Sequence, residues 1–216
     1  GNLHELSSTS TFVLVRLTAD ELVTLRGSGL GTLNPVIKSF DYSNSSTGEV
    51  LHSTGTVKLH INSFSPTFVN FTIDSITLGS LTVSIPGGQA TIIGTIVVDP
   101  LSGVASGSIS QLKETIGSTT VTFKGNLSLS VSDVISGTVT DISVLSGANT
   151  IVMSGLSVDY SALNLGSVTT ANDLFSAVGN LMSGNDTITY TNNIPGTGMT
   201  FFGGGGNDTI TISGPN

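Results

Sequence analysis

The residues of this chain best suited to chemistry are an aspartate and a run of glycines near its C-terminal end. Residues 203–211 read G-G-G-G-N-D-T-I-T. Glycine reaches the positive-φ conformations that a tight turn with inward-facing carbonyls requires. Asp208 adds a charged oxygen to the neutral carbonyl oxygens of Gly203, Gly204 and Gly206, and Ca²⁺ prefers hard oxygen ligands of both kinds. The pattern therefore predicts a calcium-binding turn that leads into a short strand.

A shorter copy of the same pattern lies upstream. Residues 183–189 read S-G-N-D-T-I-T, so Asp186 takes the place that Asp208 has in the longer copy. The segment between the copies, residues 195–202, keeps glycines but has Thr200 where an aspartate would stand, which predicts a degenerate turn. The candidate metal ligands of these two loops are Asp186, Asp208, Gly203, Gly204, Gly206, Asn185 and Asn207.

Both copies resemble the RTX calcium-binding β-roll repeat, whose nonapeptide is G-G-x-G-x-D-x-U-x with a large apolar residue at U. The resemblance covers residues 150–216. In that family each ion lies between loops two nonapeptides apart, and Asp186 and Asp208 are close to that separation. The resemblance therefore implies Ca²⁺ as the ligand and one site shared by the two loops. The competing interpretation is a flexible loop at Gly204-Gly205, followed by an ordinary hairpin turn at Asn207-Asp208.

The resemblance also implies where such a protein works. RTX proteins are bacterial cargo of type I secretion, kept unfolded in the calcium-poor cytosol and folded outside. The expected localisation is therefore extracellular or at the cell surface, and the partner expected beside calcium is a cell-surface or matrix component, as in adhesion. The sequence contains no cysteine, which fits such a cargo and excludes disulfides and thiolate metal sites.

Composition narrows the function classes further. The net charge is −8 and only 9% of the residues are charged, against about 25% in an ordinary globular domain. Serine, threonine, asparagine and glycine must then cover the surface, as is typical of extracellular β-proteins. The sequence has no basic patch, so we expect no nucleic-acid binding, and no apolar run is long enough to predict a transmembrane segment.

Between residues 35 and 165 the sequence mostly alternates apolar side chains with small hydroxyl side chains, as in L-S-L-S-V at residues 127–131. Such period-two patterns predict strands with one buried face, and turn signals such as Pro86-Gly87 separate them. We predict an all-β fold in which residues 1–165 form an antiparallel β domain, a hairpin meander folded as a sandwich or as an elongated sheet. A parallel β-helix is the competing arrangement.

The strand pattern gives way to a helical pattern at residues 169–183. Thr170 and the aspartate three positions later form a capping signal, apolar residues recur on one face, and Gly184 provides a stop. Residues 166–216 are therefore predicted to be a capping helix followed by the start of a calcium β-roll. Near the N-terminus, the spacing of Thr18 and Glu21 predicts one further helical turn.

No residue set predicts catalysis. His52 and His60, with Asp41 or Glu49 nearest in sequence, are the closest approach to a second metal pair, and exposed strand histidines are the simpler interpretation. The sequence has no G-x-S-x-G nucleophile elbow, so we predict a non-enzymatic protein. The alternatives are a hydrolase or lyase of the RTX cargo class, with its active site in the β domain, and a carrier that encloses an apolar ligand.

Threonine also recurs at alternate positions, a spacing that ice-binding β-solenoids use to display flat threonine arrays. The pairs are Thr138 and Thr140, Thr187 and Thr189, and Thr209 and Thr211. In the sequence they are scattered and out of register, so we do not expect such an array.

Overall fold

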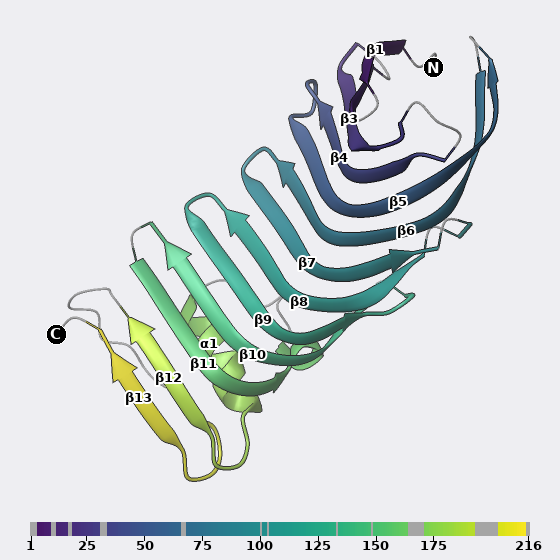
Figure 1. Cartoon of the computed structure of the whole chain (residues 1–216). Helices are drawn as coiled ribbons and strands as arrows, with labels where there is room; N and C mark the ends of the chain where they lie inside the picture. The colour runs from purple at the N-terminus through teal and green to yellow at the C-terminus, as the bar shows by residue number, and fades with distance from the viewer. Residues whose placement is uncertain are drawn as a thin grey trace. The chain divides into compact units, whose positions relative to one another are not determined.

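In a computed structural model, the chain is built almost wholly from strands (Figure 1). The structure describes residues 4–9, 12–16, 19–30, 34–65, 68–99, 101–102, 104–132, 134–147, 149–163, 171–192 and 203–214. Within these ranges the strands belong to one sheet, in the order in which they occur along the chain. The all-β prediction is confirmed, and of its two forms the structure shows the elongated sheet.

The pairing of neighbouring strands confirms the hairpin meander. The strands are β1 (His4–Thr9), β2 (Phe12–Arg16), β3 (Glu21–Ser28), β4 (Val36–Asn44), β5 (Glu49–Ser65), β6 (Phe68–Ile85), β7 (Gly88–Val98), β8 (Ala105–Ile116), β9 (Thr119–Leu129), β10 (Ile135–Ser146), β11 (Asn149–Asp159), β12 (Thr187–Asn192) and β13 (Thr209–Ser213). The helical segments are the 3₁₀ turn η1 (Tyr160–Leu163) and α1 (Ala171–Leu181). Strands β1 to β7 and β9 to β12 pair antiparallel, whereas β12 and β13 run parallel.

Contacts within the chain divide it into two compact units. The first comprises Gly1–Gly107 with Val131–Asp133, and the second comprises Ser108–Ser130 with Val134–Asn216. Helix α1 and strands β12 and β13 thus belong to the same unit as β9 to β11. The domain boundary near residue 165 stays a prediction from the sequence.

In the first unit, successive positions along β4, β5 and β6 place apolar and polar side chains on opposite faces of the sheet. Tyr42 of β4 lies beside Leu51 of β5, which lies beside Val83 of β6. One position along, Asp41 lies beside His52, which lies beside the threonine that precedes Val83. Because strand side chains alternate between faces, the apolar side chains share one face and the polar ones the other.

Glycines stand where long strands bend towards a neighbour. A Cβ on Gly55 of β5 would lie 2.7 Å from the Cα of Leu78 on β6, and one on Gly125 of β9 would lie 3.0 Å from the Cα of Val139 on β10. The β5–β6 and β9–β10 registers shift beside these glycines, which marks β-bulges, and bulges bend a strand. The long strands of Figure 1 curve accordingly.

The most deeply buried side chains lie in the second unit, under α1. Leu174 and Val178 are one helical turn apart and expose at most 2% of their surface, so they share the helix face that packs towards β11 and η1. Val139 and Ile142 of β10 and Met153 of β11 are fully buried on the sheet side. The predicted helix is therefore present; its predicted first residues, 169 and 170, lie outside the described residues.

The helical turn predicted from Thr18 and Glu21 is wrong, because Glu21 begins β3. The carbonyl of Asp20 accepts the amide hydrogen of Ser45 at 2.8 Å, and its side-chain Oδ1 accepts the Ser45 hydroxyl at 3.1 Å. Pairing with β4 has thus overridden a local capping signal. Among the described residues, no helix is both long and apolar enough to cross a membrane.

Candidate metal centre

The two G-N-D-T-I-T copies lie side by side in the second unit, at the β13 end of the sheet (Figure 1). Strands β12 and β13 pair in parallel, with Thr187 beside Thr209 and Ile188 beside Ile210. Equivalent residues of the two copies therefore stand next to each other. Ile188 is fully buried, whereas Ile210, on the outermost strand, exposes 37% of its surface.

The backbone ladder continues from the strands into the loops before them. The amide of Thr209 donates to the carbonyl of Asp186 at 2.8 Å, and the amide of Gly184 donates to the carbonyl of Gly205 at 2.7 Å. The Gly205 amide in turn donates to the carbonyl of Met182 at 3.3 Å. The loops at residues 182–186 and 203–208 are therefore stacked on each other along their length.

Two side chains reinforce this stacking. Asp208 Oδ1 accepts the backbone amide hydrogen of Asp186 at 3.0 Å, and Asn185 Oδ1 accepts that of Asn207 at 2.9 Å. Asp208 reaches back towards the preceding loop, and Asn185 reaches forward to the next one. The sequence nominated these four residues as ligands but did not reveal that two of their oxygens hold the loops together.

The second loop requires glycines for two reasons: some of its φ angles are positive, and other atoms lie too close to its backbone to leave room for a Cβ. Gly204 and Gly206 have φ angles of 80° and 131°, which side chains rarely permit. A Cβ on Gly203 would lie 2.5 Å from Asp208 Oδ2, so the carboxylate packs directly over this glycine. A Cβ on Gly206 would lie 2.5 Å from the carbonyl carbon of Gly184 and closer still to its oxygen.

One polar atom at this place has no partner. Among the described residues, Asp186 Oδ2 is the buried side-chain oxygen or nitrogen that makes no hydrogen bond. Asp186 and Asp208 each stand one position before Thr187 and Thr209, the first paired residues of β12 and β13. A buried carboxylate oxygen without a donor calls for a positively charged partner.

The donor set fits a hard cation. Every side-chain donor nominated by the sequence is an oxygen, from the carboxylates of Asp186 and Asp208 and the amides of Asn185 and Asn207. In the described part of the chain, no three His, Cys, Asp or Glu side chains gather as a metal cluster. Ca²⁺ takes six to eight oxygen ligands, so backbone carbonyls of the glycine loop would complete its shell. The degenerate turn at residues 195–202 lies outside the described residues.

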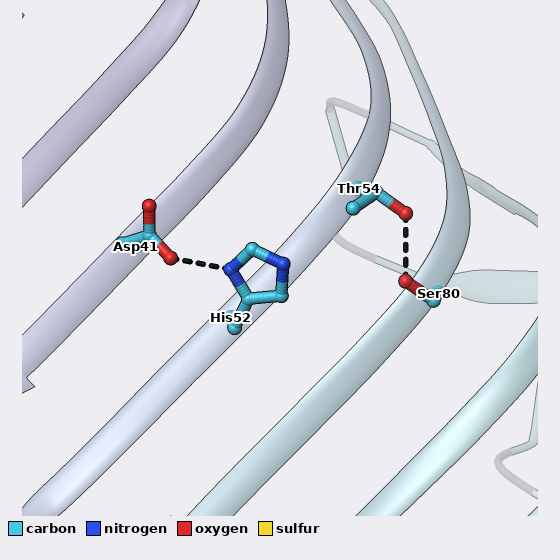
Figure 2. A network of polar contacts seen from close by, with 4 residues as sticks. All are labelled: Asp41, His52, Thr54 and Ser80. Carbon is cyan, nitrogen blue, oxygen red and sulfur yellow. Dashed lines mark hydrogen bonds and ion pairs between the residues drawn. The ribbon is translucent and has the colours of Figure 1, made fainter.

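The histidines do not form a metal pair. Nδ1 of His52 contacts Oδ1 of Asp41 across β4 and β5, at the exposed face of the sheet (Figure 2). Nδ1 of His60 instead contacts Oδ1 of Asn34 at 2.6 Å. The hydroxyls drawn beside His52, Thr54 Oγ1 and Ser80 Oγ, lie 2.6 Å apart and bond to each other (Figure 2).

Two aspartates in the described part of the chain shape turns. Asp99 accepts the amide hydrogen of Leu101 at 2.9 Å and the hydroxyl hydrogen of Ser102 at 2.8 Å. Asp159 accepts the hydroxyl hydrogen of Ser161 at 2.8 Å and its amide hydrogen at 2.9 Å. These bonds lower the pKa of both carboxyls; the largest cause is the Leu101 amide for Asp99 and the Ser161 hydroxyl for Asp159.

A small apolar crevice lies in the first unit, lined by Ile37, Phe40, Ser53, Val57 and Leu78 among others. Its interior volume is about 10 Å³, roughly the space that a single water molecule needs. This crevice is therefore far too small for a lipid or another carried ligand.

The register of β12 and β13 corrects the expectation that all the Thr-x-Thr pairs are out of register with one another. Thr187 lies beside Thr209, and Thr189 lies beside Thr211. Two of the three Thr-x-Thr pairs are thus aligned, because parallel pairing brings together residues that are 22 positions apart. Sequence spacing could have shown this only if the pairing partner of β13 had been known.

Comparison with known proteins gives no match to a family model, to a curated protein or to a solved structure.

Proposed function

We propose that the stacked loops at residues 182–186 and 203–208 bind one Ca²⁺, and that the chain is a non-enzymatic calcium-binding protein of the cell exterior. The observation that carries the proposal is the buried Oδ2 of Asp186, which has no donor. Asp208, in the loop before β13, bonds to the backbone amide of the same aspartate. A divalent cation would satisfy the orphaned oxygen and offset the negative charge of the two carboxylates.

Calcium would act here by coupling binding to folding. All five residues of β13 are exposed, so burial of apolar side chains contributes little to holding this strand against β12. The association of β13 with β12 therefore depends on backbone pairing and on the hydrogen bonds that Asp208 and Asn185 accept from backbone amides of the facing loop. A cation held between the loops would add its binding free energy to this association, as when a metal site forms only in the folded state.

The expected setting follows from composition and from the resemblance to RTX repeats. A chain with 9% charged residues, no cysteine and a net charge of −8 suits the calcium-rich exterior of a bacterial cell. The β domain would then serve adhesion, display or matrix formation, with type I secretion as its route.

Calorimetric calcium titration tests the site. We expect the wild type to bind one Ca²⁺ per chain and to bind Mg²⁺ more weakly, because Mg²⁺ demands stricter octahedral geometry. Asp186→Asn removes one charge, and Asp208→Asn removes another while keeping an oxygen for the Asp186 amide. Even at the dielectric constant of water, a unit charge about 4 Å from a divalent ion contributes about 2 kcal/mol, which is more than tenfold in affinity.

Asp99→Asn is the matched control, since it removes one charge from a turn in the first unit. It should leave the calcium affinity unchanged. A wild type without binding heat, or an Asp186→Asn variant that binds as tightly as this control, would eliminate the proposed site.

A further inference from the structure

Strand β13 ends the sheet with an open edge. Within the described ranges it pairs with β12 alone, and all five of its residues are exposed. The Thr209 amide donates to the carbonyl of Asp186 on the β12 side. Because backbone groups alternate in direction along a strand, the N–H and C=O groups of Ile210 and Ile212 point away from β12, towards the open edge.

The apolar core of the second unit ends at this edge without a cover from the described residues. Ile210 lies beside Ile188, and Ile212 lies beside Tyr190. The two β12 residues expose 0% and 1% of their surface, whereas the β13 isoleucines expose 37% and 58%, although neighbours in register share one face of a sheet. A further strand paired with β13 would therefore bury apolar surface as well as form backbone hydrogen bonds.

Strand β13 lacks the features that keep the edges of sheets from pairing. Native sheets protect an exposed edge with charged side chains, proline or a bulge. The sequence T-I-T-I-S contains neither a charged residue nor proline, and the register of β13 with β12 has no shift. By contrast β1, at the other end of the strand order, has a shift in its pairing with β2. The β13 edge is therefore able to accept a partner strand.

We propose that β13 pairs antiparallel with β13 of a second copy of this chain, about a two-fold axis at Thr211. The strand alternates in the same way in both directions from Thr211, so Ile210 of each copy lies beside Ile212 of the other. The same five residues thus supply both sides of the contact. Ile210 and Ile212 carry the outward backbone groups, and an antiparallel pair of such residues exchanges both N–H···O=C bonds, which gives about four bonds in the dimer.

The charge of the chain favours the antiparallel direction. Each copy has a net charge of −8, and the charged residue nearest to β13 in the sequence is Asp208, directly before it. In a parallel pair in register, Asp208 of one copy would lie beside Asp208 of the other. In the antiparallel pair, each Asp208 lies opposite Gly214, and the two aspartates are six positions apart along the strands, or about 20 Å. This direction therefore separates the acidic loops of the two copies.

The pairing uses the outer edge of β13 and not the ligands of the calcium site. Its failure is therefore distinguishable from failure of the proposed function. A calcium-binding heat from a chain that is monomeric at every concentration would refute the pairing alone. A dimer without a calcium-binding heat would refute the calcium site alone.

Sedimentation velocity of the full chain in CaCl₂, over a series of concentrations, tests the association. A five-residue strand is small beside the roughly 20–30 residues on each side of a standard interface. We therefore expect a reversible dimer, whose share rises with concentration. Ile212→Lys places a charge on the open edge and should weaken the dimer at least about tenfold, since lysine is a usual protection of edges.

Ile116→Lys is the matched control for this variant. Ile116 is an isoleucine of β8 in the same unit and is 66% exposed, so its replacement adds the same charge away from β13. It should form the dimer as the wild type does. Circular dichroism and thermal unfolding of both variants should match the wild type, because each replaced side chain is largely exposed.

Cysteine variants test the direction and the register, and they decide if Ile212→Lys misfolds. The chain has no cysteine of its own. Across the two-fold axis the residues at position 211 form a non-hydrogen-bonded pair with Cα atoms about 4.5 Å apart, which a disulfide can span. Under mild oxidation Thr211→Cys should therefore give a covalent dimer on a non-reducing gel. Thr209 is also exposed, but the two residues at position 209 are offset by four positions, or about 14 Å, so Thr209→Cys should stay monomeric.

Four results would overturn the proposal. They are a wild type that is monomeric at every concentration, an Ile212→Lys variant that dimerises like Ile116→Lys, equal cross-linking of the two cysteine variants, and growth in mass beyond the dimer. The last would show an open contact that does not close by two-fold symmetry.

Discussion

Replacing Gly206 by alanine should weaken calcium binding about 100-fold. The alanine Cβ would lie 2.5 Å from the carbonyl carbon of Gly184 and overlap its oxygen, which is backbone and cannot swing aside. The φ angle of 131° adds a strain of about 1–3 kcal/mol for a non-glycine residue. Moving the Gly184 backbone would also weaken its amide bond to Gly205, at 2.7 Å, at a cost of about 1 kcal/mol.

Together these terms amount to about 3 kcal/mol, or about 100-fold in a dissociation constant. The cost appears in the calcium affinity because the loops must be stacked for both carboxylates to reach one ion. The assay is calorimetric titration with CaCl₂, with thermal unfolding in EDTA as a second measurement of loop stacking.

Gly205→Ala supplies the matched control one position away. A Cβ there would have no atom within 4 Å, and Gly205 has no positive φ, while alanine keeps both of its backbone hydrogen bonds. This variant should bind calcium within a factor of about two of the wild type, since changes at unstrained exposed positions stay within about 0.5 kcal/mol. Equal calcium affinities for Gly206→Ala and Gly205→Ala would refute the reasoning that stacking of the two loops creates the site.

Three further predictions concern the sheet. Ile142→Ala should lower the free energy of unfolding by about 2–5 kcal/mol, because Ile142 is fully buried. Val97→Ala is the control: this residue is 50% exposed, and its replacement should change the free energy of unfolding by under about 0.5 kcal/mol. Urea unfolding measures both variants. Gly125→Ala should destabilise the same transition by more than Val97→Ala, because its Cβ would lie 3.0 Å from the carbonyl carbon of Thr138 and closer to the oxygen. The Asp99 carboxyl, followed by NMR, should titrate with a pKa below the usual aspartate value, since the hydrogen bond from the Leu101 amide lowers this pKa. The resulting contribution to stability is present above the unfolded-state pKa of about 3.9 and disappears as the pH falls through the folded-state pKa. A titration midpoint at the usual aspartate value would contradict the turn geometry.

The strand content was predictable because it depends on short-range alternation. Hydroxyl and apolar residues alternate in the sequence, and the faces of β4, β5 and β6 follow that alternation in register. The helical turn at Thr18 and Glu21 failed for the opposite reason. A capping signal is worth about 1 kcal/mol, which pairing of β3 with β4 along its whole length exceeds.

The sequence nominates the residues of the candidate site, but it does not predict the hydrogen bonds between them. Glycine and aspartate at fixed spacing nominated Asp186 and Asp208, because only some residue types can build such a turn. Which backbone amide each side chain would hold depended on the parallel pairing of β12 and β13. The bond from the Asp186 amide to Asp208 and the alignment of the threonines both follow from that register, which no local pattern encodes.

The glycines at the bends, such as Gly55 and Gly125, have a consequence for how this chain can diverge over evolutionary time. Positions on the strand faces need only remain apolar on one side and small and polar on the other, so many substitutions there are neutral. The bend glycines have no substitute, since any side chain would meet the neighbouring backbone. Descendants of this chain should therefore retain the rhythm of their glycines long after their strand residues have ceased to resemble one another.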